Sequence, residues 1–200
     1  MRVKNSMKNI YYSVLIQVCM TLLGFISRRV FINNLDIEYL GVNGLLTNIL
    51  SMLSLVEGGI GASIVYNMYK PLAEDDKPAI IALVQLYKKL YMVVAAIVFV
   101  ISLAIYPFLG NIMKDSASVS YITIIYFIFV AKNIVSYLNA HKWSLINADQ
   151  KGYVLNKYNL RFNIATYIIK ILVLQITKNY VLYIVMEFII SLIQTIWNGS

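Results

Sequence analysis

The sequence predicts an all-helical (all-α) membrane protein, a polytopic transmembrane helix bundle with six spans. Of its 200 residues, 60% are hydrophobic and 13% are charged, and the mean hydropathy is +0.72. A soluble domain of this size leaves roughly a third of its potential surface exposed, so it could not bury so much apolar surface. The apolar residues form continuous runs rather than alternating patterns, which favours helices over a barrel. The 16 tyrosines fit this class, because tyrosine is enriched where a membrane meets water.

The first three spans are predicted from uncharged runs, since a crossing helix needs about 20 mostly apolar residues. Asn9–Ser27 is uncharged, and its apolar stretch is too long for a signal-peptide core, so it should remain in the mature chain. Tyr39–Val56 and Gly58–Tyr69 are separated only by Glu57, and Leu90–Met113 is the longest uncharged run. These runs predict spans at about 10–31, 42–66 and 88–110.

The last three spans are predicted from runs that are each interrupted by a single charge, at Lys132, Lys170 and Glu187. They cover about 119–141, 158–177 and 179–198. The two longest connections, Asn67–Tyr87 and Lys142–Lys157, are polar and too short to hold a soluble domain. Residues 1–200 are therefore expected to form one six-helix transmembrane lobe.

Basic residues are distributed unequally between the two ends of this bundle. If the N-terminus is cytoplasmic, the cytoplasmic segments hold 11 basic residues and the opposite side holds four. Because cytoplasmic loops carry the excess of lysine and arginine, both termini are predicted to lie in the cytoplasm, with the chain in the plasma membrane. The net charge of +8 is dispersed over loops, which indicates attraction to anionic membrane lipids and no nucleic-acid partner. The 11 residues are Arg2, Lys4, Lys8, Lys70, Lys77, Lys88, Lys89, Lys142, Lys151, Lys157 and Arg161.

A polar stripe follows the first span and ends at the doublet Arg28-Arg29. Its members are three or four residues apart and so share one helical face. Polar groups in a bilayer usually face a bundle interior or a wet cavity, although Gln17 could bond a neighbouring helix and the arginines could reach the interface. A guanidinium can also hold a phosphate through two parallel hydrogen bonds. The stripe consists of Ser13, Gln17, Thr21, Gly24 and Arg28.

The second span places Glu57 directly before three glycines, Gly58, Gly59 and Gly61. Glycines allow close helix packing, a kink or local unwinding. A carboxylate at this depth needs a partner, a proton or water. Packing and a role in conformational change are both open for this segment.

Lys132, Lys170 and Glu187 lie within the predicted spans, where a charge is costly. Lys170 and Glu187 are in adjacent helices and could pair with each other. Several helices thus combine a polar face with an occasional charge. Together these faces would line a hydrophilic cavity that holds cations, Arg28 among them, and acids such as Glu57. A large anionic substrate with a polar body would suit such a cavity.

Common enzyme motifs are absent from the sequence, including phosphate-binding and dinucleotide glycine loops, HExxH and the nucleophile elbow. The segment Glu74-Asp75-Asp76 is similar in letters to a glycosyltransferase motif, but its short polar linker favours a solvated turn. A lone histidine, His141, and a lone cysteine, Cys19, cannot supply a zinc-type ligand set. The chain is therefore expected to be no enzyme, with no cofactor and no metal site.

Several ordered motifs occur between Ser27 and Tyr91: an arginine before Phe31-Ile32, then EYLGVNGL, LSLVEGGIG, YKPLAEDD and YKKLY. This region resembles the amino-terminal signature of polysaccharide (O-antigen or capsule-type) repeat-unit flippases. These belong to the multidrug/oligosaccharidyl-lipid/polysaccharide exporter superfamily. The stretches LINADQKGYVLNKYN and TKNYVLYIVMEFI are similar to the fourth-to-sixth helix region of the same family. The resemblance covers essentially all 200 residues.

The resemblance implies a MATE-like fold, of which this chain matches only the amino-terminal six-helix lobe. Members carry undecaprenyl-diphosphate-linked oligosaccharides across the membrane by alternating access. It makes Arg28 and Arg29 candidates for binding the lipid diphosphate, and Glu57 a candidate for proton coupling or for supporting a helix break. The implied partners are a lipid-linked oligosaccharide and a second transporter lobe or a polysaccharide polymerase. Membrane depth and helical spacing, rather than the resemblance, add Gln17, Lys132, Lys170 and Glu187.

Two other functions remain open at this point. One is a non-transporting membrane remnant or scaffold of polysaccharide assembly. The other is a drug/cation antiporter of the same superfamily, against which the cationic side chains argue because they would repel a cationic drug.

Overall fold

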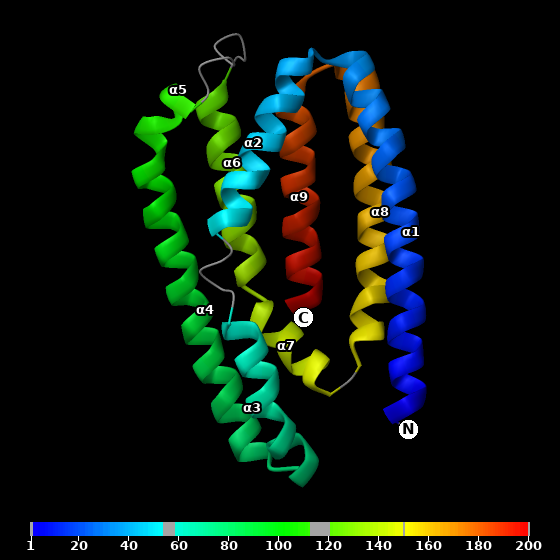
Figure 1. Ribbon diagram of the computed structural model, residues 1–200, viewed down its shortest axis with the longest axis vertical. Helices are drawn as coiled ribbons and strands as arrows, with labels where there is room; N and C mark the ends of the chain where they lie inside the picture. Colours follow the sequence, from blue (N-terminus) through cyan, green and yellow to red (C-terminus); the bar gives the residue numbers. More distant parts are fainter. Residues whose placement is uncertain (1, 54–58, 113–120, 150, 200) are drawn as a thin grey trace.

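The computed structural model describes residues 2–53, 59–112, 121–149 and 151–199, and all regular structure in these ranges is helical. Figure 1 shows long helices standing side by side with their axes nearly parallel. In chain order the elements are α1 (Arg2–Asn34), α2 (Ile37–Leu53), α3 (Ile60–Glu74), α4 (Lys77–Ile105), the short 3-10 turn η2 (Tyr106–Phe108), α5 (Leu109–Ile112), α6 (Ile122–Tyr137), α7 (Ala140–Ala148), α8 (Gly152–Thr177) and α9 (Tyr180–Gly199).

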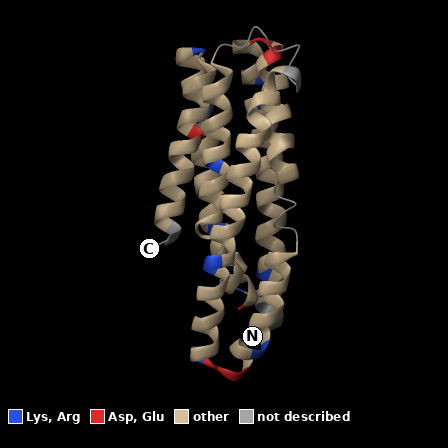
Figure 2. Cartoon of the chain, turned by 90° about the vertical axis from the view of Figure 1, so that its left-hand side faces the viewer, with Lys and Arg blue, Asp and Glu red and all other residues tan. Residues whose placement is uncertain are grey.

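The arrangement places α9 in the middle of the bundle. It packs against α6 on one side and against α8 on the other, and α1 packs along α8 (Figure 1). The start of α1, the turn from α3 to α4, and α7 lie at one end of the molecule, which we call the N-terminal end. The turns from α1 to α2 and from α8 to α9 lie at the opposite end. Charged residues are sparse along the length of the bundle between these ends (Figure 2).

Four described helices are long and apolar enough to cross a membrane: Met7–Asn34, Lys77–Phe108, Gly152–Thr177 and Tyr180–Trp197. A fifth crossing results if α6 and α7, which meet at 41°, form one bent span. These helices support a membrane protein of the all-helical class. The expected span 42–66 falls on α2 and α3, and residues 54–58 between these two helices lie outside the described residues.

The two expected connections are much shorter than the sequence suggested. Only Asp75 and Asp76 separate α3 from α4, because Asp76 caps α4 by accepting a hydrogen bond from the Ala79 amide (3.1 Å) and a proline follows at the helix start. Asp75 adopts a left-handed conformation with φ of 52°. The second connection, expected at Lys142–Lys157, contains most of α7 and the first turns of α8. Both polar connections between the expected spans are therefore largely helical, since polar residues continue these helices beyond the apolar runs.

Aromatic side chains form a large part of the buried core near the opposite end. Phe31 of α1 packs edge-on against Tyr180 and Tyr183 of α9, with ring centroids 5.7 and 5.4 Å apart. Tyr39 of α2 meets Tyr180 in the same way at 5.3 Å. Edge-to-face contacts of this kind add about 0.5–1.5 kcal/mol each beyond area burial. These contacts hold α9 against α1 and α2 on the same part of α9 that carries the polar residues of the candidate site.

Candidate functional site

The candidate site is built on one face of α9. Tyr180, Tyr183 and Glu187 follow one another at steps of three and four residues, so they share one face of the helix. Glu187 lies seven residues into α9, and Lys170 lies seven residues before the end of α8. At 1.5 Å per residue, both lie about 10 Å along the helix axes from the turn that joins the two helices.

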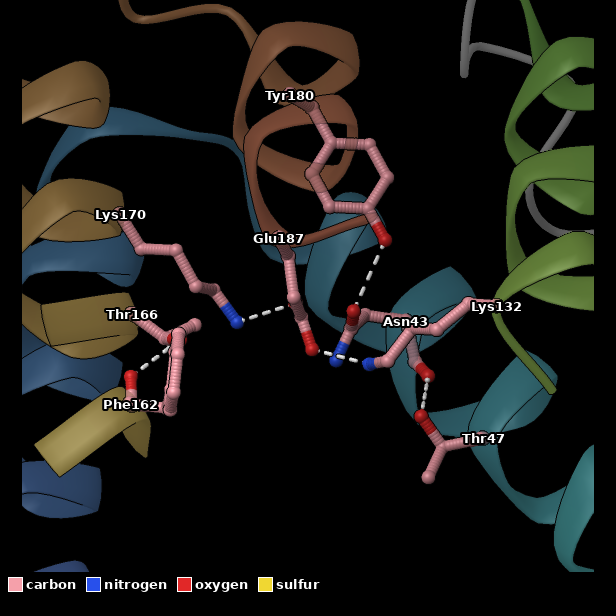
Figure 3. A network of polar contacts seen from close by, with 8 residues as sticks. All are labelled: Asn43, Thr47, Lys132, Phe162, Thr166, Lys170, Tyr180 and Glu187. Carbon is pink, nitrogen blue, oxygen red and sulfur yellow. Dashed lines mark hydrogen bonds and ion pairs between the residues drawn. The ribbon is translucent and has the colours of Figure 1, made fainter. Parts of the chain in front are cut away.

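Glu187 binds two lysines from two other helices. Its Oε2 accepts a hydrogen bond from Lys170 of α8 at 2.5 Å, and its Oε1 accepts one from Lys132 of α6. Figure 3 shows the carboxylate between the two ammonium groups. The pairing of Lys170 with Glu187, which the sequence suggested, is confirmed. The two cations and one anion together leave one positive charge in excess.

The two lysines have different surroundings. The Lys170 side chain is only 12% exposed, and its ammonium lies 4.4 Å from the centroid of the Tyr183 ring. The Lys132 side chain is 38% exposed, with the Phe129 ring centroid at 5.9 Å. Lys170 is buried between a carboxylate and an aromatic face, whereas the Lys132 side chain is more exposed. Lys132 is therefore the more accessible of the two cations.

Neutral polar groups extend the site onto α2. The Tyr180 hydroxyl donates to Asn43 Oδ1 at 3.0 Å, and the Thr47 hydroxyl donates to the Asn43 carbonyl at 2.7 Å (Figure 3). Asn133 of α6 donates to the Leu50 carbonyl at 3.5 Å. These bonds tie α2 to α9 and α6, so helices far apart in the sequence share one polar layer.

Lys132 opens into a pocket of about 260 Å³ between α2 and α6. The pocket is half-open, and its polar lining consists of hydroxyl, amide and ammonium groups. An ammonium beside neutral hydrogen-bonding groups suits an anion with a polar body. The lining residues are Thr47, Leu50, Ser51, Phe129, Lys132, Asn133 and Ser136.

The polar stripe of the first span runs along α8 rather than into this pocket. Asn156 of α8 donates to the Ser13 hydroxyl at 3.2 Å, and Gly24 faces the Tyr167 hydroxyl of α8. Gln17 is exposed, and its backbone carbonyl accepts the Thr21 hydroxyl at 2.8 Å. The stripe therefore serves, at least in part, to pack α1 against α8 through polar groups.

Arg28 and Arg29 are both exposed near the opposite end of α1. Neither arginine forms an ion pair or hydrogen bond with any residue in the described ranges. The structure thus does not bring them into the lysine–glutamate site. Both guanidinium groups remain open to a ligand or to lipid phosphates.

The acidic and glycine-rich segment is only partly described. Glu57 and Gly58 lie outside the described residues. Gly59 precedes α3, and a Cβ at this position would meet no atom within 4 Å. A Cβ on Gly61 would come to 3.4 Å from the Tyr91 hydroxyl. Neither Gly59 nor Gly61 has a positive φ, and a Cβ on either would meet no atom closer than ordinary van der Waals contact.

Sequence reasoning missed the contact between Lys132 and Glu187, which are 55 residues apart. The sequence did show that each is a lone charge inside an apolar run, and such charges tend to pair. It also missed the bond between Gln194 of α9 and Asn159 of α8, at 2.8 Å. Nothing in the sequence says which of two lysines a glutamate will bind, or that it will bind both.

Within the described ranges, no three His, Cys, Asp or Glu side chains come together in a way that would hold a metal ion. The site is an ion-paired polar layer beside a half-open pocket.

Comparisons of the chain with protein-family profiles, curated proteins and solved structures found no match.

Proposed function

We propose that this chain takes part in translocating undecaprenyl-diphosphate-linked oligosaccharide repeat units across the plasma membrane for surface polysaccharide biosynthesis. In this proposal the chain is the amino-terminal lobe of a flippase, with both termini in the cytoplasm. One observation carries the proposal: Glu187 binds two lysines, Lys132 and Lys170, and Lys132 also lines a polar pocket. An anionic lipid headgroup bearing sugars has the complementary chemistry.

The proposal includes six crossings arranged as a MATE-like lobe. The crossings would be α1, α2 with α3, α4, α6 with α7, α8, and α9. One of these six, α6 with α7, is interrupted by a bend of 41°. Residues 54–58, between α2 and α3, lie outside the described residues. Interrupted helices are common around the substrate sites of secondary transporters. A second lobe would then close the other side of the cavity.

The ion pairing weighs against the alternative of a cation antiporter. A carboxylate at membrane depth can bind a cation only if its oxygens are free. Both oxygens of Glu187 are already bound to lysine ammonium groups. The charge near the pocket therefore favours an anionic substrate.

Binding of a fluorescent undecaprenyl-diphosphate-linked sugar to the chain in lipid nanodiscs tests the proposal. Lys132→Gln should weaken binding about tenfold, because a hydrogen bond to a charged group is worth about 1.5–3 kcal/mol. Lys132→Arg should retain most of it. Lys89→Gln is the matched control, since Lys89 is exposed on α4 and does not line the pocket. Equal binding by the Lys132→Gln and Lys89→Gln variants, or no binding by the unmodified chain, would overturn the proposal.

A further inference from the structure

A second groove lies between α8 and the C-terminal part of α9, apart from the lysine–glutamate site. It measures about 340 Å³ and is lined by Tyr158, Arg161, Phe162, Ala165 and Trp197. Three of these five residues are aromatic, and Arg161 is the one charged member. The composition differs from the hydroxyl and amide lining of the pocket at Lys132.

Arg161 has no counter-charge in the described part of the chain. It is exposed and forms no ion pair or hydrogen bond with a described residue. A guanidinium stays charged at any physiological pH and presents several N–H donors in a plane. Its hydrogen bonds must therefore be satisfied by water or by an anion from outside the described chain.

The depth of the groove puts it near a membrane surface. Arg161 lies 16 residues before the end of α8, and Trp197 lies 17 residues after the start of α9. At 1.5 Å per residue both are about 25 Å from the turn between these helices. The hydrocarbon core is about 30 Å thick, so both side chains lie close to the interface at the N-terminal end. Tryptophan and tyrosine favour this level, where their rings contact acyl chains and their polar atoms meet headgroups.

The N-terminal end also carries other basic residues. Lys157 is exposed near the start of α8, and the Lys8 ammonium of α1 lies 5.2 Å from the Tyr153 ring centroid. Lys151, by contrast, is paired with Asp149 Oδ2 at 2.5 Å. Basic residues beside a membrane attract anionic lipids by about 1 kcal/mol each. The groove at Arg161 also offers aromatic side chains that a lipid can contact. We propose that it binds the headgroup of an anionic phospholipid, with Arg161 on the phosphate and the aromatic rings along the glycerol and upper acyl chains.

This assignment does not depend on the transport proposal, because it concerns a bulk membrane lipid and a different groove. Zwitterionic phospholipids also contain a phosphate, but their ammonium group cancels its charge. The groove should therefore distinguish phosphatidylglycerol from phosphatidylcholine. Arg161 should account for most of the difference, since it is the charged residue in the lining.

Quenching of Trp197 by brominated lipids tests the assignment directly. The chain has two tryptophans, and Trp143→Phe leaves Trp197 as the reporter. This substitution removes no hydrogen bond to a described residue, since Trp143 Nε1 has no such partner. In phosphatidylcholine bilayers, brominated phosphatidylglycerol should bind at Trp197 about fivefold more strongly than brominated phosphatidylcholine. Adding Arg161→Gln should remove most of this preference.

Lys157→Gln is the matched control, because Lys157 lies one turn away on α8 and does not line the groove. It should keep most of the preference. Equal quenching by the two lipids in the Trp143→Phe chain, or an equal loss in the Lys157→Gln and Arg161→Gln chains, would overturn the assignment. So would loss of the preference on adding inorganic phosphate but not chloride, which would identify a soluble anion as the ligand. Native mass spectrometry of phosphatidylglycerol retained by the unmodified chain and by Arg161→Gln gives a second reading that needs no tryptophan substitution.

Discussion

The Lys170 ammonium lies 2.5 Å from Glu187 Oε2, joining two helices that are consecutive in the chain and antiparallel in space. The same carboxylate reaches Lys132 on a third helix. Lys170 and Glu187, whose charges would each be costly in lipid, thus neutralise one another. The third charge, on Lys132, belongs to the more exposed side chain. Glu187 is therefore the residue at which α6, α8 and α9 are joined by charge.

Replacing Glu187 by glutamine should strongly destabilise the protein. The substitution leaves two ammonium groups facing each other without a carboxylate, and breaking a buried ion pair in this way costs about 3 kcal/mol. We expect a lower apparent melting temperature in detergent, measured by size-exclusion chromatography of samples heated to increasing temperatures. Glu38→Gln on the exposed start of α2 should leave it unchanged. An unchanged melting temperature for Glu187→Gln would mean that the ion pairs contribute nothing to stability.

The two lysines should differ in their effects. Lys170→Met should lower the melting temperature more than Lys132→Met, because the Lys170 side chain is 12% exposed and that of Lys132 is 38% exposed. The double variant Lys170→Met/Glu187→Gln should be more stable than the sum of its single changes predicts, by about 0.5–3 kcal/mol, since paired residues couple. Additive effects would contradict the direct contact.

Tyr180→Phe removes the hydroxyl that donates to Asn43 and so weakens the contact between α9 and α2. We expect a loss of about 1 kcal/mol in the free energy of unfolding, the usual net value of one hydrogen bond. Tyr11→Phe is the matched control, since the Tyr11 side chain is 65% exposed on α1. Equal free energies of unfolding for the Tyr180→Phe and Tyr11→Phe variants would show that the bond to Asn43 does not stabilise the protein.

Arg28→Ala and Arg29→Ala should leave the folded protein intact. Both side chains are exposed and make no contact of charge or hydrogen bonding within the described residues, so each change should alter stability by less than about 0.5 kcal/mol. If Arg28 binds the lipid diphosphate, Arg28→Ala at normal membrane levels should abolish translocation of lipid-linked oligosaccharide in cells supplied with a complete transporter. Unchanged translocation would remove Arg28 from the proposed function.

Gly59→Ala should be tolerated in the fold, because a Cβ there meets no atom within 4 Å and the residue has no positive φ. Gly61→Ala brings a Cβ to 3.4 Å from the Tyr91 hydroxyl, which is ordinary contact. Each change should alter the free energy of unfolding by less than about 1 kcal/mol. Preserved melting with reduced translocation would indicate that glycine is needed for movement of α3, whereas loss of folded protein would show a packing role.

Much of the helical architecture followed from the sequence. Long uncharged runs predicted α1 and α4, and runs with a single internal charge predicted α8 and α9, because a continuous apolar helix needs lipid around it. Boundaries were less predictable: the polar segment 67–87 remains helical except at Asp75 and Asp76. Polar residues near the ends of a span carry no apolar signal, so local capping rather than hydropathy decides where such helices stop.

By itself, the sequence determined that this protein is a helical membrane protein with lone charges at membrane depth. It also indicated that Lys170 and Glu187, which lie in adjacent helices, could pair with each other. Only the tertiary structure decided that Lys132 joins them and that Arg28 and Arg29 do not. The physical reason is that pairing between distant helices depends on how α6, α8 and α9 are packed, which helical spacing along a single chain does not encode.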